Sequence, residues 1–246
     1  MIEIVVSGAA GRLGSRIAAV CAETAGLAVR SKIDRDDAFE PAKGAVLIET
    51  APRAIAIEHA DRARRAGMPI LVCTTGFDPA ERKALEAAAK DVPLIIAANL
   101  SLGVAVLTEL VARASAAVPD WALEITEIHH DKKRDAPSGT AWALGRAAAV
   151  ARDRDIDRDA ILARAGDVGP RGHNEIGMQS LRGGDVVGEH TVFFFGAAER
   201  LELTHRASNR DVFAHGAARA ASFLGDPGRA AGLYTMADVL GLKDER

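Results

Sequence analysis

Two adjacent histidines followed by two lysines are the residues of this sequence best suited to proton chemistry. His129 and His130 come directly after an alternating run from Trp121 to Ile128, so they would emerge where a strand ends. The pair Lys132-Lys133 adds positive charge beside them. Imidazole titrates near neutral pH, and an ammonium group can hold an anion or give up a proton. The segment therefore predicts acid–base chemistry on an anionic small molecule.

A predicted helix begins just after this segment, at Pro137-Ser138-Gly139-Thr140. Its first turn offers free backbone N–H groups and two hydroxyls, which together form a cradle for a carboxylate or a phosphate. A surface loop beside a capped helix would contain the same residue types, so the residues alone leave that alternative open. No metal site is expected, because neighbouring histidines of an extended chain point apart and no third ligand has a suitable spacing.

The glycine-rich run 8–14, Gly-Ala-Ala-Gly-Arg-Leu-Gly, follows a short apolar run and opens a stretch with helical spacing. A dinucleotide fingerprint needs this context, because its glycines make a tight turn and let the backbone approach a pyrophosphate at a helix N-terminus. The spacing is a variant of the commoner GxGxxG, and another α/β protein could use such a loop as a plain turn. Asp34 ends the second predicted strand, where an acid would bind the adenosine ribose.

Arg35 follows this acid and could pair with a 2′-phosphate, which the acid itself disfavours. Asp34 and Arg35 together predict a site for NADH that also accepts NADPH, unless both are solvated loop charges. Two further segments, Cys73-Thr74-Thr75-Gly76 and Ala97-Ala98-Asn99-Leu100, follow predicted strands at the edge where open α/β sheets bind ligands. By composition alone, an ordinary turn is the plainer interpretation of each.

The elements that must position these residues alternate over the first hundred residues. Continuous apolar strands separated by stretches with helical spacing predict a parallel sheet covered on both faces, that is, a Rossmann-type α/β domain. The predicted strands are 2–6, 27–33, 45–48, 70–73 and 94–97, and the predicted helices are 13–23, 53–65 and 79–90.

The pattern changes after Asn99 and predicts a second, α+β domain that carries a mostly antiparallel sheet. Glycines at 183–184 and at 196 separate the last three strands, as in antiparallel hairpins. The charged run 153–159 looks like a solvated connector. The expected strands are 121–128, 175–181, 186–195 and 200–205, and the expected helices are 103–117, 139–150 and 210–224.

The composition restricts the class of protein. The 246 residues include 31 basic and 34 acidic side chains, and 48% are hydrophobic. Because no basic stripe stands out, nucleic-acid binding is not expected, and no apolar run approaches the roughly 20 residues of a membrane span. The two cysteines, Cys21 and Cys73, lie in apolar segments without CxxC spacing, which indicates buried free thiols in a reducing compartment. We therefore expect a cytoplasmic globular protein.

The stretch from His129 to Ala141 resembles the signature of the 4-hydroxy-tetrahydrodipicolinate reductase family: a histidine pair, a lysine and then Asp-Ala-Pro-Ser-Gly-Thr-Ala. The resemblance covers nearly the whole chain. It implies an NAD(P)H-dependent oxidoreductase that reduces 4-hydroxy-tetrahydrodipicolinate on the route to diaminopimelate and lysine. The other matching runs are the glycine loop, Asp34-Arg35, 74–78, 97–99 with Ser101, 184–191 and 199–207.

The resemblance also implies roles for the site residues. His129 would be the catalytic proton donor or acceptor, and Lys133 the second proton donor. The nucleotide domain would comprise 1–99 completed by 218–246, and 100–217 would bind the substrate and assemble a homotetramer. The dicarboxylate substrate would contact His130, Ser138, Gly139 and Thr140. NADH or NADPH would contact Gly8, Ala9, Ala10, Gly11, Arg12, Leu13, Asp34, Arg35, Cys73, Thr74, Thr75, Ala97, Ala98, Asn99 and Leu100.

Several departures from the family pattern concern the cofactor. The family usually has Asp-Phe-Thr or Asp-Phe-Ser after the third strand, where this chain has Ile48-Glu49-Thr50, so the aromatic expected beside the nicotinamide is missing. Leu100 replaces a usual phenylalanine and Cys73 a usual glycine, and the region between Asp34 and Ala45 is short. Two other functions stay open: another NAD(P)-dependent enzyme acting on an imine or amino acid, and a regulator that binds NAD(P)H without turnover.

Overall fold

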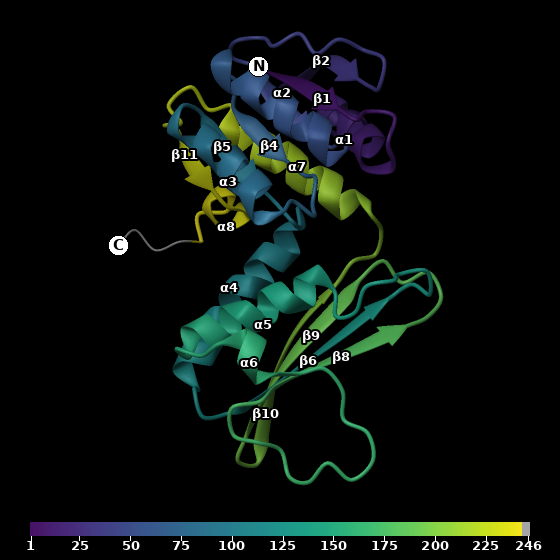
Figure 1. Cartoon of the computed structure of the whole chain (residues 1–246), viewed down its shortest axis with the longest axis vertical. Coiled ribbons are helices and arrows are strands. Elements are labelled where there is room, and N and C mark those ends of the chain that lie inside the picture. The colour runs from purple at the N-terminus through teal and green to yellow at the C-terminus, as the bar shows by residue number, and fades with distance from the viewer. Residues whose placement is uncertain (243–246) are drawn as a thin grey trace. The chain divides into compact units, whose positions relative to one another are not determined.

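The computed structural model describes residues 1–242, which form two compact units (Figure 1). Unit 1 contains Met1–Leu102 and the described residues from Asp211 on, and unit 2 contains Gly103–Arg210. The second boundary falls at 210/211 rather than at the 217/218 expected from the sequence, because one unbroken helix starts at Asp211. The end of the expected segment 218–246, residues 243–246, lies outside the described residues.

Unit 1 is built on a parallel sheet of six strands in the order β11-β5-β4-β3-β1-β2. The chain runs from β1 to β2 on one side and then starts again with β3 on the other. The carboxyl ends of the strands at such a switch point form the crevice in which α/β sheets bind ligands. The predicted Rossmann-type sheet is confirmed. The strands are β1 (Ile2–Ser7), β2 (Leu27–Ile33), β3 (Val46–Glu49), β4 (Ile70–Val72), β5 (Pro93–Ile96) and β11 (Gly232–Tyr234).

Helices cover both faces of this sheet. Helix α1 packs against α7 on one face of the sheet, and α2 packs against α3 on the other. On the α2 side, Val5, Leu47 and Ile70 of the strands share a hydrophobic core with residues of α2 and α3. Asp78 caps α3 through a capping box with Glu81. The helices are α1 (Arg12–Glu23), α2 (Arg53–Arg65), α3 (Pro79–Ala87) with the 3-10 turn η1 (Ala88–Lys90), α7 (Asp211–Leu224) and α8 (Met236–Val239).

The strand β11 and the helix α8 are not predicted by the sequence. They are only three and four residues long, too short for either hydrophobic period to show. β11 pairs in parallel with β5, with Leu233 opposite Leu94, and so becomes the edge of the sheet of unit 1. The C-terminal segment therefore belongs to the first sheet although it follows unit 2 in the chain.

Unit 2 contains a mixed sheet of five strands in the order β10-β9-β6-β8-β7. β9 is antiparallel to both β6 and β10, whereas β8 is parallel to β6 and β7. The predicted hairpin between β9 and β10 is confirmed. The hairpin expected at Gly183-Gly184 is wrong, because β6 lies between β8 and β9. The strands are β6 (Ala122–His129), β7 (Ala160–Ile161), β8 (Ile176–Arg182), β9 (Glu189–Gly196) and β10 (Glu199–Arg206).

Two helices, α4 (Leu102–Ala117) and α5 (Gly139–Ala151), share one core with the sheet of unit 2. The predicted solvated connector is wrong in part, because it contains the short helix α6 (Ile156–Asp159). Ile156 is buried in this core, where a Cβ on Gly145 would lie 3.1 Å from its Cδ1 atom. A single apolar residue within a charged run has no periodicity by which a sequence could reveal it.

Candidate active site

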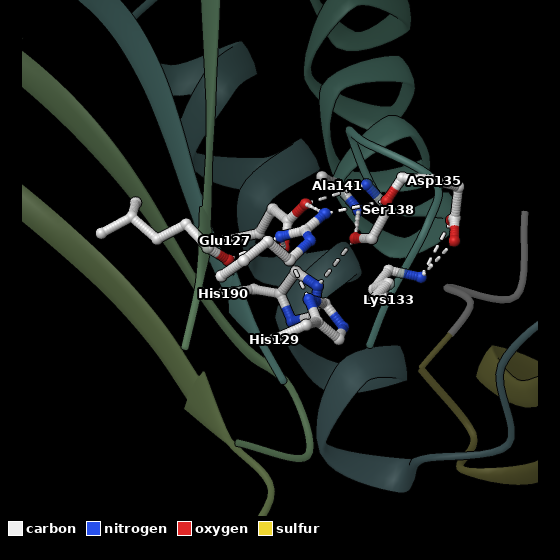
Figure 2. Close-up of polar contacts among 9 residues, drawn as sticks. Glu127, His129, Lys133, Asp135, Ser138, Ala141 and His190 are labelled. Carbon is white, nitrogen blue, oxygen red and sulfur yellow. Dashed lines mark hydrogen bonds and ion pairs between the residues drawn. The ribbon is translucent and has the colours of Figure 1, made fainter. Parts of the chain in front are cut away.

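A buried carboxylate, Glu127, is the centre of a polar network in unit 2 (Figure 2). It follows Leu123 and Ile125 on the inward face of β6 and is 1% exposed. Arg182, at the end of β8, donates to both of its carboxylate oxygens, at 2.8 and 2.9 Å, and the backbone N–H of Ser138 donates at 3.1 Å. Burial raises the pKa of Glu127, but these donors outweigh it and lower the pKa to about 2. Glu127 is therefore ionised at neutral pH.

His129, the last residue of β6, is oriented by this carboxylate. Its Nδ1 lies 2.5 Å from Oε2 of Glu127, which places a proton on Nδ1 and leaves Nε2 as the nitrogen that can meet a ligand. Burial lowers the pKa of His129, Glu127 opposes this, and the positive charges of Lys133 and Arg182 lower it further. The imidazole is therefore neutral near pH 7 and held in one orientation.

Lys133 lies in the loop between β6 and α5. Figure 2 shows its ammonium group turned towards Asp135, with Nζ 2.8 and 3.0 Å from the two carboxylate oxygens. This hydrogen bond lowers the pKa of Asp135. Because Asp135 is largely exposed, the pair contributes about 0–1 kcal/mol, and an anionic ligand could replace it at little cost.

The predicted helix start at Pro137–Thr140 is confirmed. Ser138 is the N-cap of α5, and its Oγ accepts a hydrogen bond from the backbone N–H of Ala141 at 3.1 Å. A Cβ added at Gly139 would meet nothing within 4 Å, so the backbone of this first turn borders open space. The backbone N–H of His130 donates to the carbonyl of Val186 at 2.7 Å, which ties the histidine pair to the loop after β8. The structure thus brings the predicted substrate and catalytic residues to one end of unit 2.

His190 completes this network and has no role in the sequence-based assignment. It stands directly opposite Glu127 in the pairing of β6 with β9, and its Nε2 lies 3.1 Å from Oγ of Ser138. Its ring meets that of His129 edge to face at 5.2 Å. Burial lowers the pKa of His190 to about 4, so the ring is neutral at physiological pH. The sequence signal that could have identified His190 is its place in the alternating pattern of β9, on the same buried face as Val192 and Phe194.

In unit 1, the glycine loop borders a cavity of about 410 Å³ at the carboxyl ends of β1 and β3. Asp34 accepts hydrogen bonds from the backbone N–H of Ala10 at 2.7 Å and from that of Arg35 at 3.0 Å. Gly8 has φ +72°, and a Cβ there would lie 2.7 Å from Oγ1 of Thr50, so this position requires glycine. The residues around this cavity fit a dinucleotide whose phosphates approach the loop.

A second cavity in unit 1, of about 270 Å³, gathers the segments after β4 and β5. Thr74 belongs to the same segment, but its hydroxyl turns away and donates to the carbonyl of Ala51 at 2.7 Å. Phe213 of α7 contributes an aromatic side chain that the sequence-based assignment missed. The lining residues are Leu13, Cys73, Thr75, Ala97, Ala98, Asn99, Leu100 and Phe213.

Comparison with known proteins matches both halves of the chain. Models described as dihydrodipicolinate reductase, N-terminus and C-terminus, match residues 37–100 and 103–240. Proteins named 4-hydroxy-tetrahydrodipicolinate reductase from Anaeromyxobacter dehalogenans and Syntrophotalea carbinolica are 42% and 39% identical. The alignments cover 99% of this chain and 99% and 100% of theirs, respectively. The chain belongs to the 4-hydroxy-tetrahydrodipicolinate reductase family.

The solved structures agree with this assignment of the fold. A dipicolinate-bound dihydrodipicolinate reductase from Paenisporosarcina sp. superposes with a TM-score of 0.78 at 19% identity, covering 97% of this chain and 98% of that one. The resemblance seen in the motifs is therefore confirmed, and this chain is a member of a family of reductases.

Glu49, at the end of β3, is fully buried and lines neither of these two cavities. One carboxylate oxygen accepts from the backbone N–H of Ala51 at 2.6 Å, and the other lies 2.9 Å from Nδ1 of His59. Oγ of Ser7 lies 3.0 Å from the same nitrogen. Because both partners face one ring nitrogen, this is not the arrangement of a Ser-His-acid triad. Glu49 therefore makes an internal polar contact between β3 and α2 at the position where the sequence resemblance leads us to expect an aromatic side chain.

Other features of this family member concern metals, membranes and thiols. Within residues 1–242, no group of three or more His, Cys, Asp or Glu side chains could hold a metal ion. In the same range, no helix is long and apolar enough to cross a membrane. Cys21 and Cys73 are buried free thiols, as expected, and burial raises the pKa of Cys21 to about 11.

Proposed function

We propose that this protein reduces 4-hydroxy-tetrahydrodipicolinate to tetrahydrodipicolinate with NADH or NADPH, in the synthesis of diaminopimelate and lysine. The observation that carries the proposal is the network of unit 2, in which a buried carboxylate orients His129 beside the N-terminus of α5. Family membership supports the substrate, because the relatives that match over their full lengths are named for it.

The roles of the residues follow from their surroundings. Loss of the 4-hydroxyl group of the substrate as water gives a conjugated cyclic imine. Addition of a hydride, which a bound nicotinamide would supply, to this imine leaves negative charge that must be protonated. His129 would deliver this proton from Nε2 in its imidazolium form, which Glu127 stabilises, and Lys133 supplies a second donor and a positive charge. The two carboxylates of the substrate are held by the open helix start and its neighbours, namely His130, Ser138, Gly139 and Thr140.

Unit 1 is the dinucleotide-binding domain in this proposal. Asp34 and Arg35 at the larger cavity would hold the adenosine half, and Gly8–Leu13 would meet the pyrophosphate. Cys73–Thr75 and Ala97–Leu100, which follow β4 and β5 at the smaller cavity, would hold the nicotinamide half. Both cofactors are used, because the carboxylate suits a free ribose and the guanidinium suits a 2′-phosphate.

Substitutions at the two charges test the cofactor assignment. We expect Asp34→Ala to weaken NADH more than NADPH, and Arg35→Ala to do the reverse. Fluorescence titration of each variant with each nucleotide measures this without turnover. Equal effects on the two nucleotides would remove both residues from the ribose site.

Unit 2 is the domain of substrate binding and assembly. We expect a cytoplasmic homotetramer that associates through the outward face of the second sheet. Phe193 and Phe195 stack on that face with ring centroids 6.0 Å apart, and Phe195 is 38% exposed. Sedimentation velocity checks the assembly, and a monomer at micromolar concentration would contradict it.

A coupled assay tests the function itself. The substrate is generated in place by a synthase from pyruvate and aspartate semialdehyde, and the oxidation of NADH and of NADPH is followed separately. Turnover with this substrate, and much slower turnover with a panel of other cyclic imines, is the expected result. Faster turnover with another imine would assign a different reductase, and nucleotide binding without turnover on any of them would indicate a regulator.

A further inference from the structure

Ser138 and His190 form a buried pair behind the helix start of unit 2. We propose that His190 is a positioning residue that turns the hydroxyl of Ser138 into a dedicated hydrogen-bond donor to a carboxylate of the substrate. The proposal rests on the proposed function only in taking this carboxylate from the dicarboxylate substrate. His190 itself touches the serine and does not need to touch the ligand.

The contacts of Ser138 define its hydrogen-bonding capacity. Oγ accepts from the backbone N–H of Ala141 at 3.1 Å, and Nε2 of His190 lies at the same distance. The main chain of Ser138 is fixed as well, because its N–H donates to Oε1 of Glu127. Figure 2 shows Ser138 held between these partners from α5, β6 and β9. A hydroxyl oxygen has one proton and two lone pairs, so the state of His190 decides where the serine proton points.

The tautomer of His190 follows from its other nitrogen. The ring is 3% exposed and neutral, and its Nδ1 is buried without a hydrogen-bond partner in the part of the chain described here. A proton on Nδ1 would leave a buried donor unsatisfied, which is rarer in proteins than an under-used acceptor. The proton therefore sits on Nε2, and His190 donates to Oγ of Ser138.

This tautomer of His190 determines the direction in which the hydroxyl proton of Ser138 points. With Ala141 and His190 both donating to Oγ, its lone pairs are filled, and the O–H must point to a third group. Among residues 1–242 no hydrogen-bond acceptor for it is found. The neighbouring Gly139 borders open space, so a carboxylate seated on the first turn of α5 is the acceptor that this arrangement lacks. The opposite tautomer would turn the same hydroxyl inward and give the ligand only lone pairs.

Two measurements on the whole chain test the proposal. The first is the tautomer, read from the ¹⁵N shifts of labelled histidine, with His190→Gln used to assign its signals. The second is the affinity for dipicolinate, measured by calorimetry in wild type, His190→Leu, His190→Gln and Ser138→Ala. We expect Nε2–H in the wild type. We expect about tenfold weaker dipicolinate binding in His190→Leu, the loss of one hydrogen bond to a charged group.

The controls separate positioning from packing. His190→Gln can place an amide N–H near Oγ and should restore affinity to within about threefold of wild type. In a Ser138→Ala background, His190→Leu should cause no further loss, whereas a mere packing defect would add its own effect. NADH affinity, which depends on unit 1, should not change in any variant.

The outcomes distinguish this proposal from the proposed function. An Nδ1–H tautomer, an undiminished effect of His190→Leu in the Ser138→Ala background, or failure of His190→Gln to restore affinity would each overturn the role of His190. If wild-type protein shows the Nε2–H tautomer but neither binds dipicolinate nor turns over substrate, the proposed function fails, and the hydroxyl serves no substrate carboxylate.

Discussion

Glu127 joins Arg182, Ser138 and His129 through its two carboxylate oxygens. Arg182 compensates its charge, the N–H of Ser138 ties it to the start of α5, and His129 receives its orientation from it. Removing the carboxylate of Glu127 should destabilise the whole network, because each partner would lose a hydrogen bond in a region of low dielectric. His129 and Ser138, which are proposed to act on the substrate, are therefore held in place by Glu127, which is proposed only to position them.

The two proposed proton donors should be separable from nucleotide binding. We expect His129→Gln and Lys133→Ala each to lower kcat by about 10²–10⁴, the usual contribution of a positioned general acid, while NADH binding persists. The double variant should lose less than the product of the two, because groups that act as a unit are not additive. His130→Gln should act mainly on KM. Steady-state kinetics with NADH fluorescence titration decides, and near-wild-type turnover in both single variants would sink the mechanism.

Replacing Glu127 should shift the pKa of His129 in a predictable direction. The carboxylate raises the pKa of His129 against the effects of burial and of nearby cations, so Glu127→Gln should lower that pKa. The alkaline limb of kcat/KM against pH, where the proton donor His129 loses its proton, should move to lower pH. The value of kcat should fall by roughly tenfold or more because His129 loses its orientation. Glu124→Gln is the matched control, because Glu124 lies on the same strand but pairs with Arg164 and Arg171 instead. An unshifted alkaline limb in Glu127→Gln would show that Glu127 does not act on the pKa of His129.

At the scale of elements, hydrophobic periodicity predicts most of the helices and strands. The pairing register of the strands, which decides which residues meet, is known only from the structure. The runs 27–33 and 53–65 are reproduced as β2 and α2 because their apolar residues recur at one clear period. The pairing of β6 with β9 sets Glu127 opposite His190, and no local pattern encodes this pairing. The sequence therefore predicts the histidine pair and the helix start, but not the residues behind them.

An acidic residue at a position expected to be buried is the one sequence signal that could have revealed these buried polar networks. Leu123, Ile125 and Glu127 share the inward face of β6, and a carboxylate in that series must meet a donor inside the fold. Glu49 is the second case, since it ends the apolar strand β3. Residue types show that such a group needs a partner, whereas only the fold shows that the partners are Arg182 in one unit and His59 in the other.

The contact between Glu49 and His59 ties β3 to α2 and can be measured as stability. His59→Leu leaves a fully buried carboxylate without its side-chain partner and should cost about 3–5 kcal/mol of unfolding free energy. Glu49→Leu combined with His59→Leu should cost less than His59→Leu alone, because no buried charge is left unpaired. Glu58→Ala, at an exposed position of the same helix, should change little. Urea unfolding measures all of them, and a double variant less stable than the single one would refute the account.

At the scale of the molecule, each of the two units carries its own part of the proposed reaction. The two cavities proposed to hold the nucleotide lie within unit 1, and the polar network around Glu127 lies within unit 2. Variants in one unit should therefore leave the ligand of the other bound, which is why NADH affinity serves as a control for every substitution around His129 and Ser138.

The buried groups of unit 2 also predict how the protein responds to acid. His190 has its pKa lowered to about 4 in the fold against about 6.5 when exposed, so its contribution to stability is complete above pH 6.5 and is lost as pH falls towards 4. A shift of this size corresponds to at most about 3 kcal/mol. Glu127, lowered to about 2 from about 4.5, continues the loss at lower pH.

We therefore expect the free energy of unfolding to fall between pH 6.5 and pH 4, before any carboxylate of ordinary pKa is fully protonated. His190→Gln removes the titrating ring and should flatten this part of the curve, while leaving the loss below pH 4.5 that belongs to Glu127. Urea unfolding at pH 7, 5.5 and 4 compares the two proteins. If wild type and His190→Gln lose the same free energy over this interval, the ring of His190 does not stay neutral in the fold. The tautomer inferred for a neutral ring would then no longer apply, because an imidazolium carries protons on both nitrogens.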